Sequence, residues 1–192
     1  WPIAPRILED VYSVADAVVF GNLMISLLKH ADRVTSASLA QLVNVIAPIM
    51  TEPGGPAWKQ TTYFPFALTS RLAKGQALEV RLESPTHTTE VYGTVATLDA
   101  VATHDAETGS TALFLVNRSR DEEAVVTIDI AALGGARVVD AQTLADDDVY
   151  AKNTLEDPER VGLVANDTAR VEDGMLTVTL PPVSWTAVEL RA

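Results

Sequence analysis

Hydrophobic residues in the first 75 positions recur at helical spacing, apart from one long apolar stretch. The pattern predicts a helix over residues 14–31 that is apolar on several sides, and Ser13 and Asp16 have the spacing of a capping box at its start. Residues 34–46 are apolar almost throughout, with small residues between them, which is typical of a strand buried on both faces. Such a strand indicates a parallel sheet or a barrel.

A second helix is expected after a loop rich in proline and glycine. The loop occupies residues 51–56 and is followed by a helical pattern over 58–72, in which Pro65 should introduce a kink or a break. The order helix, strand, helix predicts that residues 1–75 are the last part of an α/β layer.

The hydrophobic period changes to two after Gly75, where apolar and polar residues alternate. Asp173-Gly174 is the preferred signal for a two-residue hairpin turn, and residues 107–110 carry another turn signal. Short strands separated by turns predict a β-sandwich or jelly roll over residues 76–192. The expected strands span residues 78–82, 91–103, 113–116, 126–130, 169–172, 175–180 and 185–190.

Composition and charge exclude several classes of function. The chain has 47% hydrophobic residues, enough for a sizeable core, and 26 acidic against 14 basic residues give a net charge of −12 that repels nucleic acids and anionic membranes. Cysteine is absent, which excludes disulfides and thiolate chemistry and permits a reducing compartment. The most apolar run, residues 14–28, is shorter than the roughly 20 residues that span a bilayer. We therefore expect neither a nucleic acid nor a membrane as a partner.

Carboxylates that could act in hydrolysis are few in residues 1–75. Glycoside hydrolysis needs two of them about 5–9.5 Å apart. Glu9, Asp10 and Asp16 stand at a helix start, where negative charge complements the helix dipole, and Asp32 belongs to the turn after that helix. Glu52, in the Pro/Gly loop, can face a cleft, but the sequence places no second carboxylate beside it.

No motif for a metal, a nucleotide or a nucleophile is present. The acidic run at residues 146–148 lacks the spacing of a calcium loop and is typical of a solvated loop. His30, His87 and His104 are scattered and do not have the spacing of metal ligands. Neither a nucleophile elbow nor a glycine-rich phosphate loop occurs, so we expect no metal and no cofactor.

Gln41 is an amide inside the apolar run. Burying an amide costs free energy unless its donors and its acceptor are satisfied, so Gln41 is expected either to bind the backbone or to contact a polar ligand. A position near the carboxyl end of a parallel strand favours the contact with a ligand, because barrels and open α/β sheets bind ligands there. Both interpretations stay open from the residues alone. Asn44 lies on the other face of the strand or in the next loop and is expected to be structural.

Four blocks of the sequence are distinctive and read ADRVTSASLAQLVNVIAPIMTEPGGPAWKQTTYFPF, VATHDAETGSTALFLVNRS, NTLEDPERV and LPPVSWTAVEL. Together they resemble the C-terminal part of family 51 glycoside hydrolases, the α-L-arabinofuranosidases, and the resemblance extends over essentially all 192 residues. The most specific part is AQLVNVIAPIMTE, which contains Gln41.

The resemblance implies a (β/α)8 catalytic barrel followed by a sandwich of jelly-roll type, with residues 34–43 as the eighth barrel strand. It also implies a retaining, exo-acting enzyme that releases L-arabinofuranose from arabinan, arabinoxylan or arabino-oligosaccharides without metal or cofactor. Both catalytic glutamates would lie upstream of Trp1, so no catalytic residue is expected in this chain. Gln41 matches a glutamine that hydrogen-bonds the furanose, and Ser38 stands where many relatives have cysteine.

A chain with one barrel strand and two helices cannot close a barrel. It is therefore expected to need the remainder of the same polypeptide and to be inactive alone. Residues 1–6 have neither an initiator methionine nor a signal pattern, which predicts that the chain begins in the middle of a domain. The family implies a homo-oligomer and a cytoplasmic location.

Two other interpretations concern the sandwich. It can be a carbohydrate-binding module, although such modules present aromatic platforms and only 6% of this chain is aromatic. Trp185 follows two prolines at the start of a strand and is predicted to be a core residue. The sandwich can also be a bracing or oligomerisation element, which is compatible with a role in an enzyme.

Overall fold

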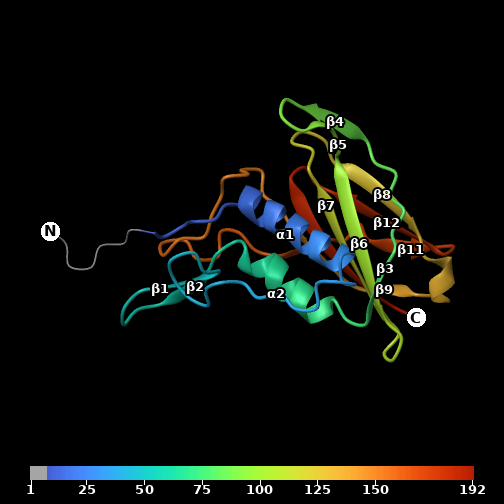
Figure 1. The fold of residues 1–192 in the computed structure, drawn as a ribbon, viewed down its shortest axis with the longest axis horizontal. Helices are drawn as coiled ribbons and strands as arrows, with labels where there is room; N and C mark the ends of the chain where they lie inside the picture. The colour runs from blue at the N-terminus through green and yellow to red at the C-terminus, as the bar shows by residue number, and fades with distance from the viewer. Residues whose placement is uncertain (1–7) are drawn as a thin grey trace.

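The computed structural model describes residues 8–192, so the expectation about residues 1–6 lies outside the described residues. Two α-helices pack on a β-sandwich in this part of the chain (Figure 1). The elements are α1 (Val14–Lys29), β1 (Ile49–Thr51), β2 (Ala57–Lys59), α2 (Tyr63–Leu72), β3 (Gln76–Leu78), β4 (Thr86–Thr89), β5 (Gly93–Ala96), β6 (Leu98–Asp105), β7 (Ser110–Asn117), β8 (Ala124–Asp129), the 3-10 turn η1 (Ala131–Leu133), β9 (Arg137–Leu144), β10 (Val164–Ala165), β11 (Arg170–Glu172), β12 (Met175–Leu180) and β13 (Ser184–Arg191).

The predicted β-sandwich is confirmed. A six-stranded antiparallel sheet with the order β10-β9-β13-β7-β6-β3 faces a three-stranded sheet with the order β11-β12-β8. Asp173-Gly174 joins β11 to β12, and residues 106–109 join β6 to β7, as the turn signals predict. Leu176, Val178 and Leu180 point into the space between the sheets and are at most 1% exposed. One core of the protein therefore lies inside the sandwich.

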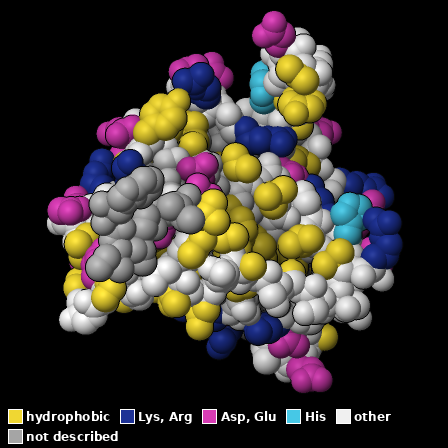
Figure 2. Space-filling view, turned by 60° about the vertical axis from the view of Figure 1, so that its left-hand side comes forward, with side chains coloured by type: hydrophobic (Ala, Val, Ile, Leu, Met, Phe, Trp, Pro, Cys, Tyr) yellow, Lys and Arg dark blue, Asp and Glu magenta, His cyan; other side chains and the backbone are white. Residues whose placement is uncertain are grey.

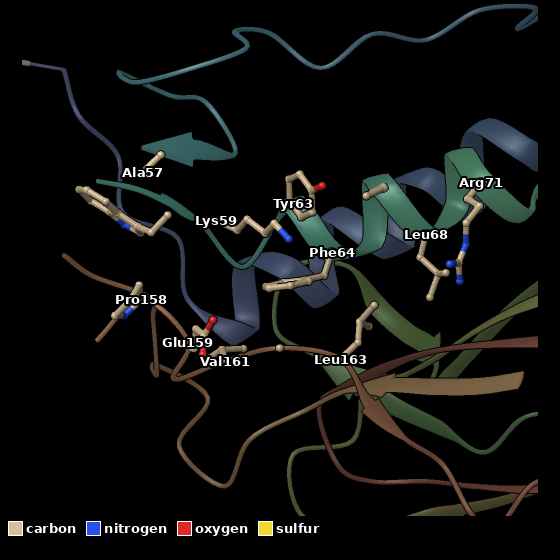
Figure 3. A pocket seen from close by; sticks show the side chains of 13 residues that line it. Ala57, Lys59, Tyr63, Phe64, Leu68, Arg71, Pro158, Glu159, Val161 and Leu163 are labelled. Atoms are coloured by element: carbon tan, nitrogen blue, oxygen red, sulfur yellow. The ribbon is translucent and has the colours of Figure 1, made fainter. Parts of the chain in front are cut away.

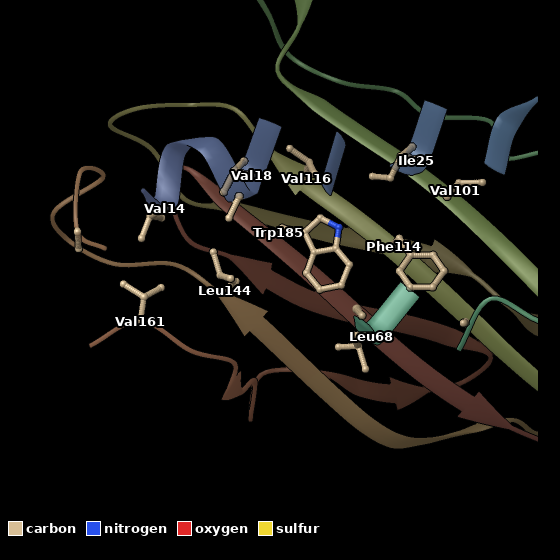
Figure 4. Packing of buried hydrophobic residues seen from close by; sticks show 14 residues of the cluster. Val14, Val18, Ile25, Leu68, Val101, Phe114, Val116, Leu144, Val161 and Trp185 are labelled. Atoms are coloured by element: carbon tan, nitrogen blue, oxygen red, sulfur yellow. The ribbon is translucent and has the colours of Figure 1, made fainter. Parts of the chain in front are cut away.

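A second core lies between the helices and the other face of the six-stranded sheet. α1 begins at the predicted capping box, in which the Ser13 amide donates to Asp16 Oδ2 at 2.8 Å and Ser13 Oγ accepts from the Asp16 amide at 3.3 Å. Trp185 of β13 is fully buried at the centre of this core and stacks on Phe114 of β7, with ring centroids 6.0 Å apart (Figure 4). The buried residues of α1 follow one helix face and are Val14, Ala17, Val18, Gly21 and Ile25.

The strand predicted over residues 34–46 is absent. This stretch has no regular secondary structure, and most of it is exposed, with Leu42 exposed by 76%. An apolar run becomes a strand only where neighbouring strands accept and donate its backbone hydrogen bonds. No strand in residues 8–192 pairs with it, and the barrel segment expected there is not seen. The chain instead forms the short β1–β2 hairpin after this stretch.

The helix predicted over residues 58–72 begins later than expected. Trp58 belongs to β2, and α2 starts at Tyr63. Pro65 is the third residue of α2 and does not break it. The first amides of a helix have no partner within the helix, so a proline in the first turn removes no hydrogen bond.

A polar cluster links the helical part to the sandwich. Asn22 of α1 donates to Asp99 Oδ2 of β6 at 2.7 Å, and Lys29 forms an ion pair with the same carboxylate. Arg118 follows β7 and donates both to Asn22 Oδ1 at 3.3 Å and to the carbonyl of Ala96 at 2.6 Å. The two parts thus share both a core and a hydrogen-bond network.

Hydrophobic side chains are also visible on the surface, near the middle of the face shown in Figure 2. Within the described residues, no helix is long and apolar enough to cross a membrane. The large apolar residues that are exposed in and around the helical part are Leu8, Val11, Val19, Leu23, Leu42, Val43 and Ile46.

Candidate functional site

Gln41 lies in the exposed stretch between α1 and β1. Sequence reasoning placed this amide inside a buried strand, and the structure corrects that expectation because Gln41 is exposed. Within residues 8–192, its side chain has no hydrogen-bond partner, so the interpretation as an amide tied to the backbone has no support there. An exposed amide keeps two donors and one acceptor available for hydroxyl groups.

Asn44 fixes the turn that follows Gln41. Its side-chain oxygen accepts from the Thr51 amide at 2.7 Å, and its Nδ2 donates to Thr51 Oγ1 at 2.8 Å. Its backbone has a φ of 60°, a left-handed conformation that asparagine tolerates better than most residues. The expected structural role of Asn44 is confirmed.

The buried amide of this region is Gln60, which the sequence pattern does not single out. Its side chain is enclosed between β2 and α2 at 1% exposure. Nε2 donates to the carbonyls of Ala47 at 2.8 Å and Asp10 at 3.1 Å, and Oε1 accepts from the Tyr12 amide at 3.1 Å. One amide thereby ties together three backbone segments that are distant in sequence.

Tyr12 provides a second link to the same stretch. Its hydroxyl donates to the carbonyl of Ile46 at 2.9 Å. Burial raises the pKa of Tyr12, and the nearby carboxylates of Asp10 and Asp16 raise it further. The hydroxyl therefore keeps its proton at neutral pH and remains a donor to Ile46.

These anchors hold residues 44–60 in place and leave Gln41 accessible. Glu52 lies in the turn between β1 and β2, where its amide donates to the carbonyl of Pro56 at 3.0 Å. Residues 33–51, which include Gln41, contain no Asp or Glu that could act as acid or nucleophile. What this region can do chemically is present hydrogen-bonding groups to a polar ligand.

The other candidates from the sequence are dispersed. Asp16 caps α1, and Asp32 lies 3.7 Å from the Arg33 guanidinium in the turn after it. His104 hydrogen-bonds Thr111 at 2.8 Å across β6 and β7, far from His30 in sequence. Residues 8–192 contain no group of three or more His, Asp or Glu side chains that could hold a metal ion.

A groove of about 730 Å³ lies between α2 and the segment 158–163, and we call it the α2 groove (Figure 3). Most of its lining residues are aromatic or aliphatic, and three of them are charged. Sequence periodicity could not reveal it, because its two walls are about 90 residues apart in the chain. Its principal lining residues are Trp58, Lys59, Phe64, Arg71, Glu159 and Leu163.

Asp146 belongs to the acidic run and fixes the wall of the α2 groove. Its carboxylate binds both terminal nitrogens of Arg160, which precedes Val161 in that wall. Burial opposes ionisation of Asp146, but hydrogen bonds from Arg160 and from the Asp148 amide, together with the positive charge, lower its pKa. The run is thus part of an ion pair within the chain.

Asp146→Asn is expected to lower the free energy of unfolding by about 1 kcal/mol at neutral pH, because Arg160 loses its charged partner. The pKa of Asp146 is lower in the folded state than in the unfolded state. The contribution of the ion pair to the free energy of unfolding is therefore present above the unfolded carboxyl pKa of about 3.9, and it is lost as the pH falls through the folded-state pKa. Urea unfolding at a series of pH values should show the difference from the parent shrinking with acidification. Asp147→Asn, at an exposed neighbour, should have little effect, and a loss independent of pH for Asp146→Asn would contradict the argument.

Comparison with known proteins gives consistent matches. The sequence pattern of the α-L-arabinofuranosidase C-terminal domain family matches residues 1–184. An exo-α-(1→6)-L-arabinofuranosidase of Bifidobacterium longum is 58% identical over 100% of this chain and 37% of its own length. An intracellular exo-α-(1→5)-L-arabinofuranosidase of Streptomyces lividans is 53% identical over 98% of this chain and 28% of its own length.

A solved structure agrees with the sequence relatives. A family 51 α-L-arabinofuranosidase from Bifidobacterium longum superposes with a TM-score of 0.93 and 49% identity, over 100% of this chain and 38% of that one. The chain therefore spans between about a quarter and two fifths of the length of these relatives.

Proposed function

Because this chain belongs to the α-L-arabinofuranosidase C-terminal domain family, we propose that it is the C-terminal part of a retaining, exo-acting α-L-arabinofuranosidase. The substrate class is terminal L-arabinofuranose on arabinan, arabinoxylan or arabino-oligosaccharides. The observation that carries the proposal is the match over residues 1–184, together with relatives that are named exo-α-L-arabinofuranosidases.

The chemistry of the proposed enzyme divides between this chain and the upstream polypeptide. A retaining glycosidase uses one carboxylic acid to protonate the leaving oxygen and one carboxylate to attack the anomeric carbon, and water then releases the sugar. We assign both carboxylates to the upstream part and assign Gln41 to a contact with the furanose hydroxyls. The exposed amide of Gln41 and the anchors at Asn44 and Ala47, which follow it, support this assignment.

We further propose that residues 1–75 complete a (β/α)8 barrel and residues 76–192 form the accessory sandwich. In this arrangement residues 34–43 would acquire strand neighbours from the upstream polypeptide, which would cover Leu42 and Val43. The exposed apolar side chains of this stretch and of α1 support the proposal, because patches of this kind usually mark an interface.

A binding module is the weaker alternative for the sandwich. Trp185 lies at 0% exposure in the core, as predicted, and cannot stack on a sugar. Tyr92 and Tyr150 are exposed, but they lie in separate loops and form no platform. An intracellular location is supported by the naming of the Streptomyces relative, and oligomerisation stays a prediction.

Gln41→Ala in the complete protein is expected to reduce kcat/KM for an aryl α-L-arabinofuranoside by an amount on the order of 1–3 kcal/mol in transition-state binding. The reason is that substrate hydroxyls lose their partner while the catalytic carboxylates stay in place. Gln76→Ala is the matched control, because Gln76 is an exposed glutamine in β3, on the sandwich. A complete protein without arabinofuranosidase activity would refute the proposed function, and an active Gln41→Ala variant with unchanged kinetics would refute only the role of Gln41.

A further inference from the structure

The turn that follows Gln41, residues 44–47, has a hydrogen bond to each of its four carbonyls, at distances of 2.8–2.9 Å. We call these residues the pinned turn. One donor lies inside the turn, and the others come from the segment before α1 and from the segment between β2 and α2. In the order of the carbonyls from 44 to 47, the donors are the Ala47 amide, the Asp10 amide, the Tyr12 hydroxyl and Gln60 Nε2.

The backbone of the pinned turn is strained. Asn44 and Val45 both have a positive φ, of 60° and 59°. A β-branched residue such as Val45 rarely adopts this left-handed conformation, and strained residues persist only where the surrounding structure determines them. Local preference therefore does not explain the shape of the pinned turn, and the hydrogen bonds from its partners do.

The pinned turn is the fixed part of the backbone that lies nearest to Gln41. Within the described part of the chain, the backbone of residues 35–43 makes no hydrogen bond. Three residues after Gln41, the Asn44 amide donates to the carbonyl of Ile49 at 2.8 Å. On the other side, the first hydrogen-bonded amide is that of Val34, seven residues before Gln41. The direction in which the chain presents Gln41 is therefore set mainly from the turn.

We propose that Tyr12 is a positioning residue for the contact between Gln41 and the sugar. Among the partners from outside the turn, Asp10 donates through its backbone amide, and Gln60 also binds other segments. The Tyr12 hydroxyl is the side-chain group that serves the turn alone, through the carbonyl of Ile46. It links the turn to the start of α1, which packs on the sheet. The inference rests on the proposed function, because it requires the ligand contact assigned to Gln41.

The test is a double-mutant cycle in the complete protein, with Tyr12→Phe and Gln41→Ala measured alone and together. Phenylalanine keeps the ring and removes the hydroxyl, so Tyr12→Phe should lower kcat/KM for an aryl α-L-arabinofuranoside by about three- to tenfold. In the Gln41→Ala background the same change should lower it by less than about twofold, because the group that Tyr12 positions is gone. Tyr92→Phe, at a tyrosine that is 82% exposed between β4 and β5, is the matched control and should leave kcat/KM unchanged.

Hydrogen exchange provides a measurement that does not depend on activity. The amides of Asn44 and Ala47 are hydrogen-bonded in and beside the pinned turn, so Tyr12→Phe should speed exchange in peptides that cover residues 44–47 at least about threefold. Peptides from β7 should exchange as in the parent protein.

The outcomes separate this inference from the proposed function. In an active protein, unchanged kinetics, unchanged exchange or an equal kinetic loss with and without Gln41 would overturn the role of Tyr12 and leave the proposed function in place. A complete protein without arabinofuranosidase activity would refute the proposed function, and in that protein unchanged exchange would still show that Tyr12 does not hold the turn.

Discussion

Replacing Gln60 by alanine is expected to lower the free energy of unfolding of the complete protein by about 3–5 kcal/mol. The substitution leaves the carbonyls of Ala47 and Asp10 and the amide of Tyr12 without their partner. Each buried polar group that loses its hydrogen bond costs about 1–3 kcal/mol, and the cavity left by the side chain adds to the loss. Urea unfolding monitored by tryptophan fluorescence measures the change.

Gln76→Ala is the control for this prediction because it makes the same substitution at an exposed glutamine of β3, on the sandwich. It should change the free energy of unfolding by less than about 0.5 kcal/mol, since surface substitutions away from special features have small effects. A loss of less than about 1 kcal/mol in Gln60→Ala would show that Gln60 is not an anchor.

The sandwich was predictable where a strand has one buried face and one polar face. In β12 the alternation of Leu176, Val178 and Leu180 with polar residues appears directly in the sequence, and these three side chains are buried. The hairpin at Asp173-Gly174 was equally readable, because Asp173 adopts a φ of 49° and Gly174 one of 76°. Local rules suffice where the turn and the pleat are set by neighbouring residues.

The region around Gln41 was not predictable in the same way. The apolar run indicates that residues 34–46 are suited to burial. A strand also requires hydrogen bonds to a neighbouring strand, and none of the described residues supplies one for this stretch. The burial of Gln60 likewise depends on Asp10 and Ala47, which the fold brings together from 50 and 13 residues away. No pattern among neighbouring residues of the sequence predicts that these three residues come into contact.

The second large effect is expected for Gly21→Ala, which should destabilise the complete protein by about 3 kcal/mol. A Cβ at Gly21 would lie 2.3 Å from Cδ1 and 2.7 Å from Nε1 of Trp185. The indole cannot retreat, because it is fully buried and stacked on Phe114. Alanine favours a helix over glycine by about 1 kcal/mol, so helix propensity alone predicts a gain in stability, and the sign of the change decides which effect dominates.

A double-mutant cycle with Trp185→Ala tests whether the clash is the cause. Truncation to alanine removes Cγ, Cδ1 and Nε1, the three atoms that a Cβ at position 21 would meet, so Gly21→Ala should cost less than about 1 kcal/mol in that background. An equal cost in both backgrounds would locate the effect elsewhere, for example in the backbone of α1. The same contact explains why α1 can approach the sheet closely enough to bury Val18 and Ile25 beside Trp185, so Gly21 sets the spacing between the helical part and the sandwich.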